Sequence, residues 1–288
     1  MKHVVCRTWR RGERWPRAIR ERPFVLSAPP GAFTLVETLI VVAAIGLLAA
    51  LLVPSAHRSL DKSKSAACVV KLRTLGTAML SYEADNHHFI PGDDAAFGNP
   101  DNLTWLSALR DYCDLDAVRS CPAAPHPGGN DLKNADGNKW GSHRHAWALN
   151  EGSWLKTPGD AGYSSYGLNM WTRRSFMDNA TMERERASLG SSRVDDISKI
   201  PMMMDARWEG LWPVDTDPVP PAGSMKDRKE IPMNGANWRM VDNLAMRRHG
   251  NGVNICFMDG SVRFVPINEL WTLKWNRNYE PPGPVNLD

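Results

Sequence analysis

One long apolar segment, Phe33–Pro54, limits what this chain can fold into. It is polar only at two threonines and at Glu37. With a helical rise of about 1.5 Å per residue, it is long enough to cross a hydrocarbon core of roughly 30 Å. A secretory signal peptide would have a shorter apolar core, of about 7–15 residues, followed by small residues at the cleavage site. Here the small residues of 27–32 come first, so we predict a transmembrane helix behind a leader peptide at 1–32.

Basic residues are concentrated before this segment. Residues 1–32 hold eight Lys and Arg side chains against two Glu, a net charge of +6, while the whole chain carries +3, which leaves −3 for residues 33–288. By the positive-inside rule, the N-terminus lies in the cytoplasm and the C-terminal body in the periplasm, outside the cytoplasmic (inner) membrane. Four basic residues within 62–73 weaken the asymmetry. The negative charge of the body argues against nucleic acid as a partner.

A second helical pattern follows Pro54. Apolar residues recur at spacings of 4, 3, 4 and 3 and form one stripe: Cys68, Leu72, Leu75, Met79 and Tyr82. Such a stripe predicts an amphipathic helix that packs on a globular body. We expect residues 55–86 to continue the membrane helix, with a break or kink near Pro54 and an end near Ala84.

Near the C-terminus, Asp259-Gly260 lies between two runs rich in β-forming residues, which predicts a β-hairpin with a two-residue turn. Such a turn needs positive φ at both residues. Counting outward pairs Phe257 with Val262 and Ile255 with Phe264. All four apolar side chains would then lie on one buried face.

The residues at the start of the apolar segment resemble a processing site. Gly31-Ala32-Phe33-Thr34-Leu35-Val36-Glu37 is similar to the cleavage and methylation motif of type IV prepilins and type II secretion pseudopilins. The resemblance implies that prepilin peptidase cuts between Ala32 and Phe33, that the new N-terminus is methylated, and that Glu37 is the fifth mature residue. Ala32 stands where Gly is commoner, and a cut after Gly31 would make Glu37 the sixth residue.

Glu37 needs either an interfacial position or a counter-charge. A carboxylate costs about 2.5–3.5 kcal/mol at the centre of a membrane helix and less near the headgroups. The freed amine of Phe33 in a neighbouring copy is a cation that would meet it, and this pairing would register one subunit against the next. The alternative is an interfacial Glu37 without a partner.

A second resemblance involves several shorter motifs. His249, nine further residues and then Asp259-Gly260 are similar to the C-terminal motif of a large family of prepilin-like proteins named for that spacing. Cys121-Pro122, Ser165–Asn169 and the strand that ends at Asp205 also look like that family.

Together the two resemblances imply a pilin-like α+β fold, in which a long N-terminal helix packs on an antiparallel β-sheet head of residues 87–288. The head would include the His-x9-Asp-Gly hairpin at 248–266. The resemblance further implies a structural subunit of a type II secretion-like or type IV pilus-like assembly. Its partners would be prepilin peptidase, other pilin-like subunits and the membrane.

His249 and Asp259, with Asp205 as a third member, are candidates for acid–base catalysis, which needs side chains within hydrogen-bond reach. An extended chain would hold His249 and Asp259 roughly 30 Å apart. We therefore expect structural roles, with Asp259 and Gly260 forming the turn and His249 making a hydrogen bond where the strand begins. The alternative is a membrane-anchored hydrolase in which His249 or His145 meets Asp205 in a cleft.

The sequence contains no nucleophile elbow, phosphate loop or metal-ligand frame, so we predict neither enzymatic activity nor a cofactor. The resemblance allows calcium at Asp205 or Asp259, but no EF-hand-like spacing supports it. Without a CxxC pair, a zinc ribbon is not expected. Cys113 and Cys121 are the closest cysteines in sequence and are candidates for a local disulfide, with buried free thiols as the alternative.

Ten tryptophans follow the leader. Trp140, Trp147 and Trp154 are seven residues apart, which is compatible with a surface for glycan stacking, and a place in the core or as loop anchors is the alternative. The second function considered is therefore an envelope module that uses the same membrane anchor and binds polysaccharide through Trp-rich loops.

Overall fold

The computed structural model describes residues 34–87, 105–128, 139–149, 162–172, 189, 194–219 and 240–286. The leader, with Ala32 and Phe33, lies outside these ranges. The chain divides into two compact units, Met1–Leu52 and Val53–Asp288.

A single helix, α1 (Leu35–Asn86), contains both the apolar segment and the amphipathic stripe. It continues through Pro54 for 52 residues in all, so the predicted break is wrong. Ala and Leu, which favour helix, dominate the turns before Pro54 and offset the hydrogen bond that proline removes. The N-terminal part of α1 is long and apolar enough to cross a membrane, and its large apolar side chains are exposed from Leu35 to Val53.

The rest of the described chain consists of short elements. The helical segments are α2 (Trp105–Ala108), α3 (Leu115–Val118), η3 (Met170–Thr172), η4 (Ile197–Lys199), α5 (Met240–Asn243) and η5 (Ile267–Thr272). The strands are β1 (Trp147–Ala148), β2 (Tyr163–Ser164), β3 (Tyr166–Asn169), β4 (Pro201–Asp205), β5 (Gly210–Leu211), β6 (Gly252–Phe257) and β7 (Val262–Pro266).

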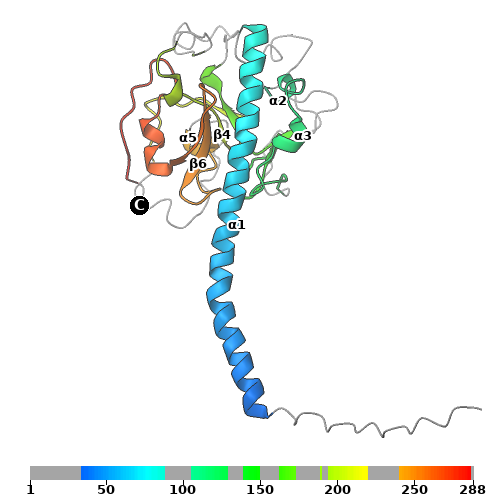
Figure 1. Cartoon of the computed structure of the whole chain (residues 1–288). Helices are drawn as coiled ribbons and strands as arrows, with labels where there is room; N and C mark the ends of the chain where they lie inside the picture. Colours follow the sequence, from blue (N-terminus) through cyan, green and yellow to red (C-terminus); the bar gives the residue numbers. More distant parts are fainter. Residues whose placement is uncertain are drawn as a thin grey trace, which may run out of the picture. The chain divides into compact units, whose positions relative to one another are not determined.

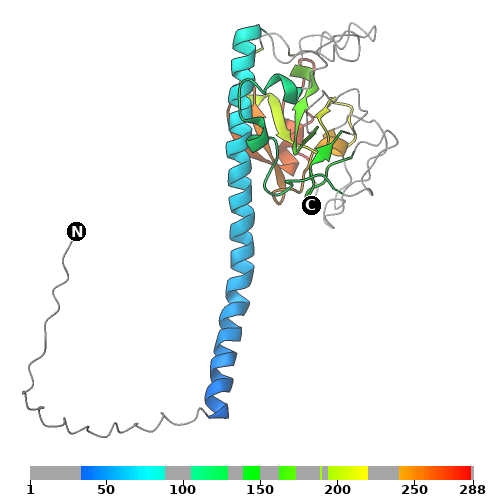
Figure 2. The same cartoon turned by 90° about the vertical axis from the view of Figure 1, so that its right-hand side faces the viewer.

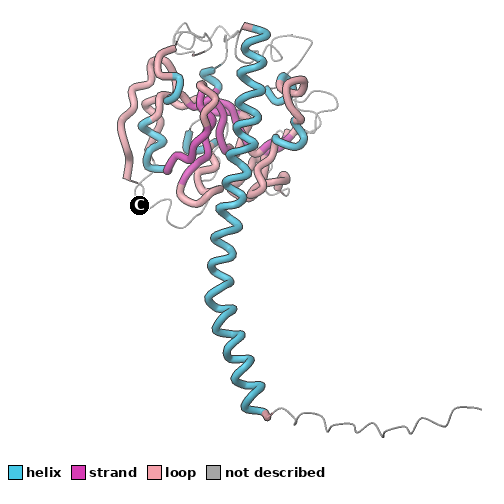
Figure 3. The backbone as a smooth tube through the Cα atoms, viewed as in Figure 1, coloured by secondary structure: helices cyan, strands magenta, loops and turns pink. Residues whose placement is uncertain are grey.

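Within the described residues, five strands form one sheet in the order β5-β3-β4-β6-β7. The strands are drawn in magenta in Figure 3. β4 pairs antiparallel with β3 and β6, and β6 pairs antiparallel with β7, as predicted for the head. β5 is parallel to β3, so the sheet is mixed rather than purely antiparallel. After β4 the chain turns back along the far side of β3, where Leu168 N donates to Glu209 O at 2.8 Å. The predicted α+β class, with one long N-terminal helix and a sheet, is confirmed.

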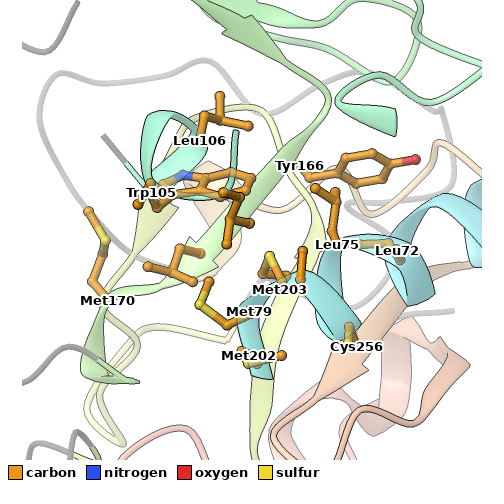
Figure 4. Packing of buried hydrophobic residues seen from close by; sticks show 14 of the residues in the cluster. Leu72, Leu75, Met79, Trp105, Leu106, Tyr166, Met170, Met202, Met203 and Cys256 are labelled. Carbon is orange, nitrogen blue, oxygen red and sulfur yellow. The ribbon is translucent and has the colours of Figure 1, made fainter. Parts of the chain in front are cut away.

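The C-terminal part of α1 runs along one side of this sheet, as both Figure 1 and Figure 2 show. The predicted stripe is buried at every position: Cys68, Leu72, Leu75, Met79 and Tyr82. Leu72, Leu75 and Met79 pack against α2, β3 and β4 (Figure 4). Gly76 lets the helix approach β6 closely, because a Cβ at this position would collide with Cys256 Sγ.

The turn between β6 and β7 contains three residues rather than the predicted two. Gly260 N donates to Phe257 O at 2.9 Å, and Phe257 N donates to Ser261 O at 2.8 Å. Gly260 has a φ of 80°, whereas Asp259 does not adopt positive φ. This is the pattern of a type I turn followed by a left-handed residue, which accommodates one more residue than a type I′ turn.

The longer turn shifts the register of the hairpin by one residue. Cys256 pairs with Val262, and Ile255 pairs with Arg263. Because side chains alternate between faces, a shift of one residue moves the second strand's apolar set to the other side. Phe264 is 43% exposed, so the predicted common buried face is wrong.

We predict that Leu72→Ala destabilises the Val53–Asp288 unit by about 2–5 kcal/mol, because it leaves a cavity between α1 and the sheet. Urea unfolding of the full chain in detergent, followed by tryptophan fluorescence, measures the effect. Leu60→Ala is the matched control on the same helix, since Leu60 is 58% exposed, and it should change stability by less than about 0.5 kcal/mol. Equal effects of the two substitutions would contradict the packing described for α1.

Candidate functional site

Four side chains with ligand or proton-transfer chemistry meet inside the Val53–Asp288 unit: Cys68, Cys121, Asp205 and His249. One ligand atom from each lies within 4.8 Å of those of the other three. Cys68, Cys121 and Asp205 are fully buried, and the side chain of His249 is 1% exposed. We call this group the Cys–His–Asp cluster.

Each member of the cluster comes from a different part of the fold. Cys68 lies on the buried stripe of α1, and Cys121 follows α3. Asp205 is the last residue of β4, the central strand of the sheet. His249 lies in the turn before β6. The site therefore exists only when α1, the α3 loop and the sheet are packed together.

Three short distances define the cluster. Cys68 Sγ donates to Asp205 Oδ1 at 3.3 Å. His249 Nε2 lies 3.3 Å from Cys121 Sγ and 3.4 Å from Asp205 Oδ2. Tyr166 OH, from β3, also donates to Cys68 Sγ at 3.4 Å. The two thiols, the imidazole and the carboxylate thus face a common centre.

Asp205 carries a fully buried charge, and several donors compensate it. Asn254 N on β6 donates to Asp205 Oδ2 at 3.0 Å, and Arg248 Nη1 lies 3.3 Å from Asp205 Oδ1. The side chain of Arg248 is itself 0% exposed. Its guanidinium also donates to three main-chain carbonyls, those of Ser142, Ser165 and Ala206. These bonds hold Arg248 against Asp205 and leave the pair fixed in one geometry.

The electrostatics of the cluster favour a charged Cys121–His249 pair. The hydrogen bond from Cys68, together with that of His249, lowers the pKa of the Cys121 thiol to about 5 despite its burial. Burial alone would lower the pKa of His249, but its hydrogen bonds with Asp205 and Cys121 outweigh burial and raise that pKa to about 9. With the pKa of Cys121 lowered and that of His249 raised, a thiolate lies beside an imidazolium at neutral pH.

The other two members are shifted in opposite directions. Burial, reinforced by Cys121 and by the charge of Asp205, raises the pKa of the Cys68 thiol well above its usual value. Burial would also raise the pKa of Asp205, but the hydrogen bond and charge of His249, followed by the charge of Arg248, lower it. Asp205 therefore stays ionised inside the protein.

A thiolate beside an imidazole that is oriented by a carboxylate is also the arrangement of an activated nucleophile. The membrane-anchored hydrolase considered from the sequence needs His249 or His145 to meet Asp205 in a cleft. His249 does meet Asp205, but both side chains are closed to solvent, as is Cys121. His145 instead lies 3.0 Å from Ser142 Oγ through Nδ1. A substrate has no access to the thiolate in this arrangement.

The structure separates the two ends of the His-x9-Asp-Gly motif. His249 precedes β6 and places its ring in the cluster, rather than only bonding where the strand begins. Asp259 is exposed in the turn that follows β6, where it accepts from Ser261 N at 2.9 Å and Ser261 Oγ at 2.6 Å. The turn-forming role predicted for Asp259 and Gly260 is confirmed, and the two residues take no part in the cluster.

The predicted disulfide is wrong, because Cys113 and Cys121 are both free thiols. Cys113 Sγ donates to Leu109 O at 3.6 Å. Cys121 Sγ points instead towards His249, a residue 128 positions away in the chain. The close spacing of the two cysteines in sequence therefore does not reflect contact in space.

Cys68 is the member of the cluster that sequence analysis missed. Its place on the apolar stripe predicted burial, and a buried cysteine on a stripe is usually a small core residue. The cluster has no compact spacing, since its members are residues 68, 121, 205 and 249. The sequence contained an indirect signal for the other three members. Cys121, Asp205 and His249 all lie in motifs that resemble the same family, and this resemblance implies that they belong to one folded head.

Glu37 has a partner within its own chain. Thr34 N and Thr34 Oγ1 each donate to Glu37 Oε2 at 2.8 Å, and Glu37 N donates to Thr34 Oγ1 at 3.3 Å. This is a capping box, which satisfies free main-chain donors at the start of α1. The alternative of an interfacial Glu37 without a counter-charge stays open, because a capping bond within the chain does not test it. The pairing of Glu37 with a neighbouring subunit stays a prediction.

Tryptophans in the described chain are mostly core residues. Of the eight that the structure describes, six are buried: Trp105, Trp147, Trp171, Trp208, Trp271 and Trp275. Trp140 is half-buried and packs on Trp208 with ring centroids 4.2 Å apart, and Trp212 is also half-buried. Trp154 lies outside the described residues. The described part of the head thus presents no exposed row of tryptophans for glycan stacking.

We predict that Arg248→Met destabilises the Val53–Asp288 unit by about 3–5 kcal/mol, because it leaves the buried Asp205 carboxylate without its arginine. Urea unfolding of the full chain measures the loss. The exposed Arg73→Met on α1 is the matched control and should stay within about 0.5 kcal/mol of wild type. A double-mutant cycle with Asp205→Asn should show coupling, and strictly additive losses would argue against this ion pair.

Comparison of the chain with protein-family models, curated proteins and solved structures gave no match. The prepilin resemblance carried by Gly31–Glu37 and by His249–Gly260 therefore stays an expectation from the sequence. The Cys–His–Asp cluster stands on its own distances, burial and hydrogen bonds.

Proposed function

We propose that the chain is a pilin-like subunit, anchored in the cytoplasmic membrane by the N-terminal half of α1 and carrying an α+β head outside it. The observation that carries the proposal is the contrast between the two halves of one helix. The large apolar side chains from Leu35 to Val53 are exposed, whereas the stripe from Cys68 to Tyr82 is buried against the sheet. An exposed apolar surface of this length needs lipid or other apolar helices to cover it.

The charge distribution supports the orientation. The net charge of +6 in residues 1–32 lies directly before the apolar segment and favours a cytoplasmic N-terminus. Removal of this leader between Ala32 and Phe33 would leave α1 with a free amine one residue before Thr34, the residue that caps the helix. Such a subunit could leave the bilayer and pack its apolar half against copies of itself in a fibre of the type II secretion or type IV pilus kind.

Processing of the N-terminus tests the proposal directly. We expect the mature protein, isolated from membranes of cells that contain a prepilin peptidase, to begin at N-methylated Phe33. Mass spectrometry of the intact protein and of its N-terminal peptide measures this. The same chain expressed without the peptidase is the control and should keep its leader. An intact Met1 in both preparations would defeat the proposal.

Two substitutions at Glu37 separate its local role from its role between subunits. Glu37→Gln removes the charge but keeps an oxygen that can complete the capping box, and Glu37→Ala removes both. If the carboxylate pairs with the amine of a neighbouring Phe33, both variants should be processed normally but fail to crosslink into oligomers in membranes. If Glu37 acts only as a cap, Glu37→Gln would assemble like the wild type, and registration by charge would be wrong.

A further inference from the structure

We propose that the Cys–His–Asp cluster binds one zinc ion, held by Cys68, Cys121, Asp205 and His249. This site is independent of the proposed function, because it uses residues of the Val53–Asp288 unit and no feature of the membrane segment. Four potential ligands from four separate segments converge on one point, with all their ligand atoms within 4.8 Å of one another. Structural zinc sites use four protein ligands.

The distances fit a tetrahedral ion. With metal–ligand bonds of about 2.0–2.3 Å, the edges of a tetrahedral zinc site are about 3.3–3.8 Å long. His249 Nε2 lies 3.3 Å from Cys121 Sγ and 3.4 Å from Asp205 Oδ2, and Cys68 Sγ lies 3.3 Å from the other carboxylate oxygen, Asp205 Oδ1. The two distances that share His249 Nε2 match edges of a tetrahedral site, and all four ligand atoms lie within 4.8 Å of one another.

The donor atoms select the metal. Two thiol sulfurs, one imidazole nitrogen and one carboxylate oxygen are the ligand types of zinc. Calcium takes six to eight oxygen ligands and magnesium an octahedron of oxygens, so the sulfur atoms argue against both. Burial of all four side chains closes the site to water, as in zinc sites that stabilise a fold rather than catalyse a reaction.

Charge balance also supports the ion. Two thiolates and the Asp205 carboxylate bring three negative charges, which a divalent ion and the buried Arg248 guanidinium neutralise together. Arg248 lies 3.3 Å from Asp205 Oδ1 and is anchored to three carbonyls, so it orients the carboxylate as partners of metal ligands commonly do. The ion would tie α1 to the central strand of the sheet through Cys68 and Asp205.

Metal content of the full chain tests the proposal. The protein is purified in detergent under anaerobic, reducing conditions, supplied with zinc, freed of unbound metal and analysed by inductively coupled plasma mass spectrometry. We expect about one zinc per chain in the wild type, and a clearly lower zinc content in Cys68→Ser and Cys121→Ser, each of which lacks one thiolate ligand. Cys113→Ser is the matched control, since Cys113 lies outside the cluster, and it should retain the metal.

A second measurement uses the wild-type protein alone, so it does not depend on the folding of a variant. Cobalt supplied in place of zinc should give the intense visible bands of a tetrahedral ion together with a thiolate-to-cobalt charge-transfer band in the near ultraviolet. Zinc added afterwards should abolish these bands. Absence of the charge-transfer band from the wild type, or equal zinc in the wild type and both serine variants, would overturn the proposal. So would a Cys68–Cys121 disulfide found by peptide mapping of protein alkylated without prior reduction.

Discussion

Asp205 ends the central strand of the sheet and holds a carboxylate with no access to water, so its charge must be balanced by the protein itself. The surrounding structure is arranged around this requirement. Asn254 N on β6 and the guanidinium of Arg248 donate to it, and Cys68 reaches it from α1. The contact from Cys68 also joins the helix to the sheet, so the carboxylate links α1 to β4.

Helix α1 meets two environments with one continuous backbone. Its first half has apolar side chains on all sides and leaves them exposed, whereas its second half shows a single buried stripe. Where the second half approaches β6, Gly76 removes the side chain that would collide with Cys256. This contrast in burial between the two halves of α1 is the physical basis of the proposed pilin-like role.

Two predictions that depend only on residues close together in the sequence were confirmed. The periodicity of 68–82 predicted the buried face of α1, and the run ending at Asp205 forms β4. The β6–β7 hairpin was placed correctly but its register was not. A type I′ turn and a three-residue turn both use Asp259-Gly260, and the choice between them rests on main-chain bonds to Phe257 that no residue pattern displays.

The sequence by itself therefore determined the apolar helix, its amphipathic continuation and the positions of the turn residues, because each follows from spacing along the chain, whereas the α+β class was implied by the resemblance to prepilin-like proteins. Tertiary structure alone decided that β5 lies parallel to β3 and that Cys121 contacts His249 rather than Cys113. It also decided that the side chains of residues 68, 121, 205 and 249 lie close together. The reason is physical. A cluster of four side chains from four segments is created by packing layers together, and chain spacing carries no record of distances across those layers.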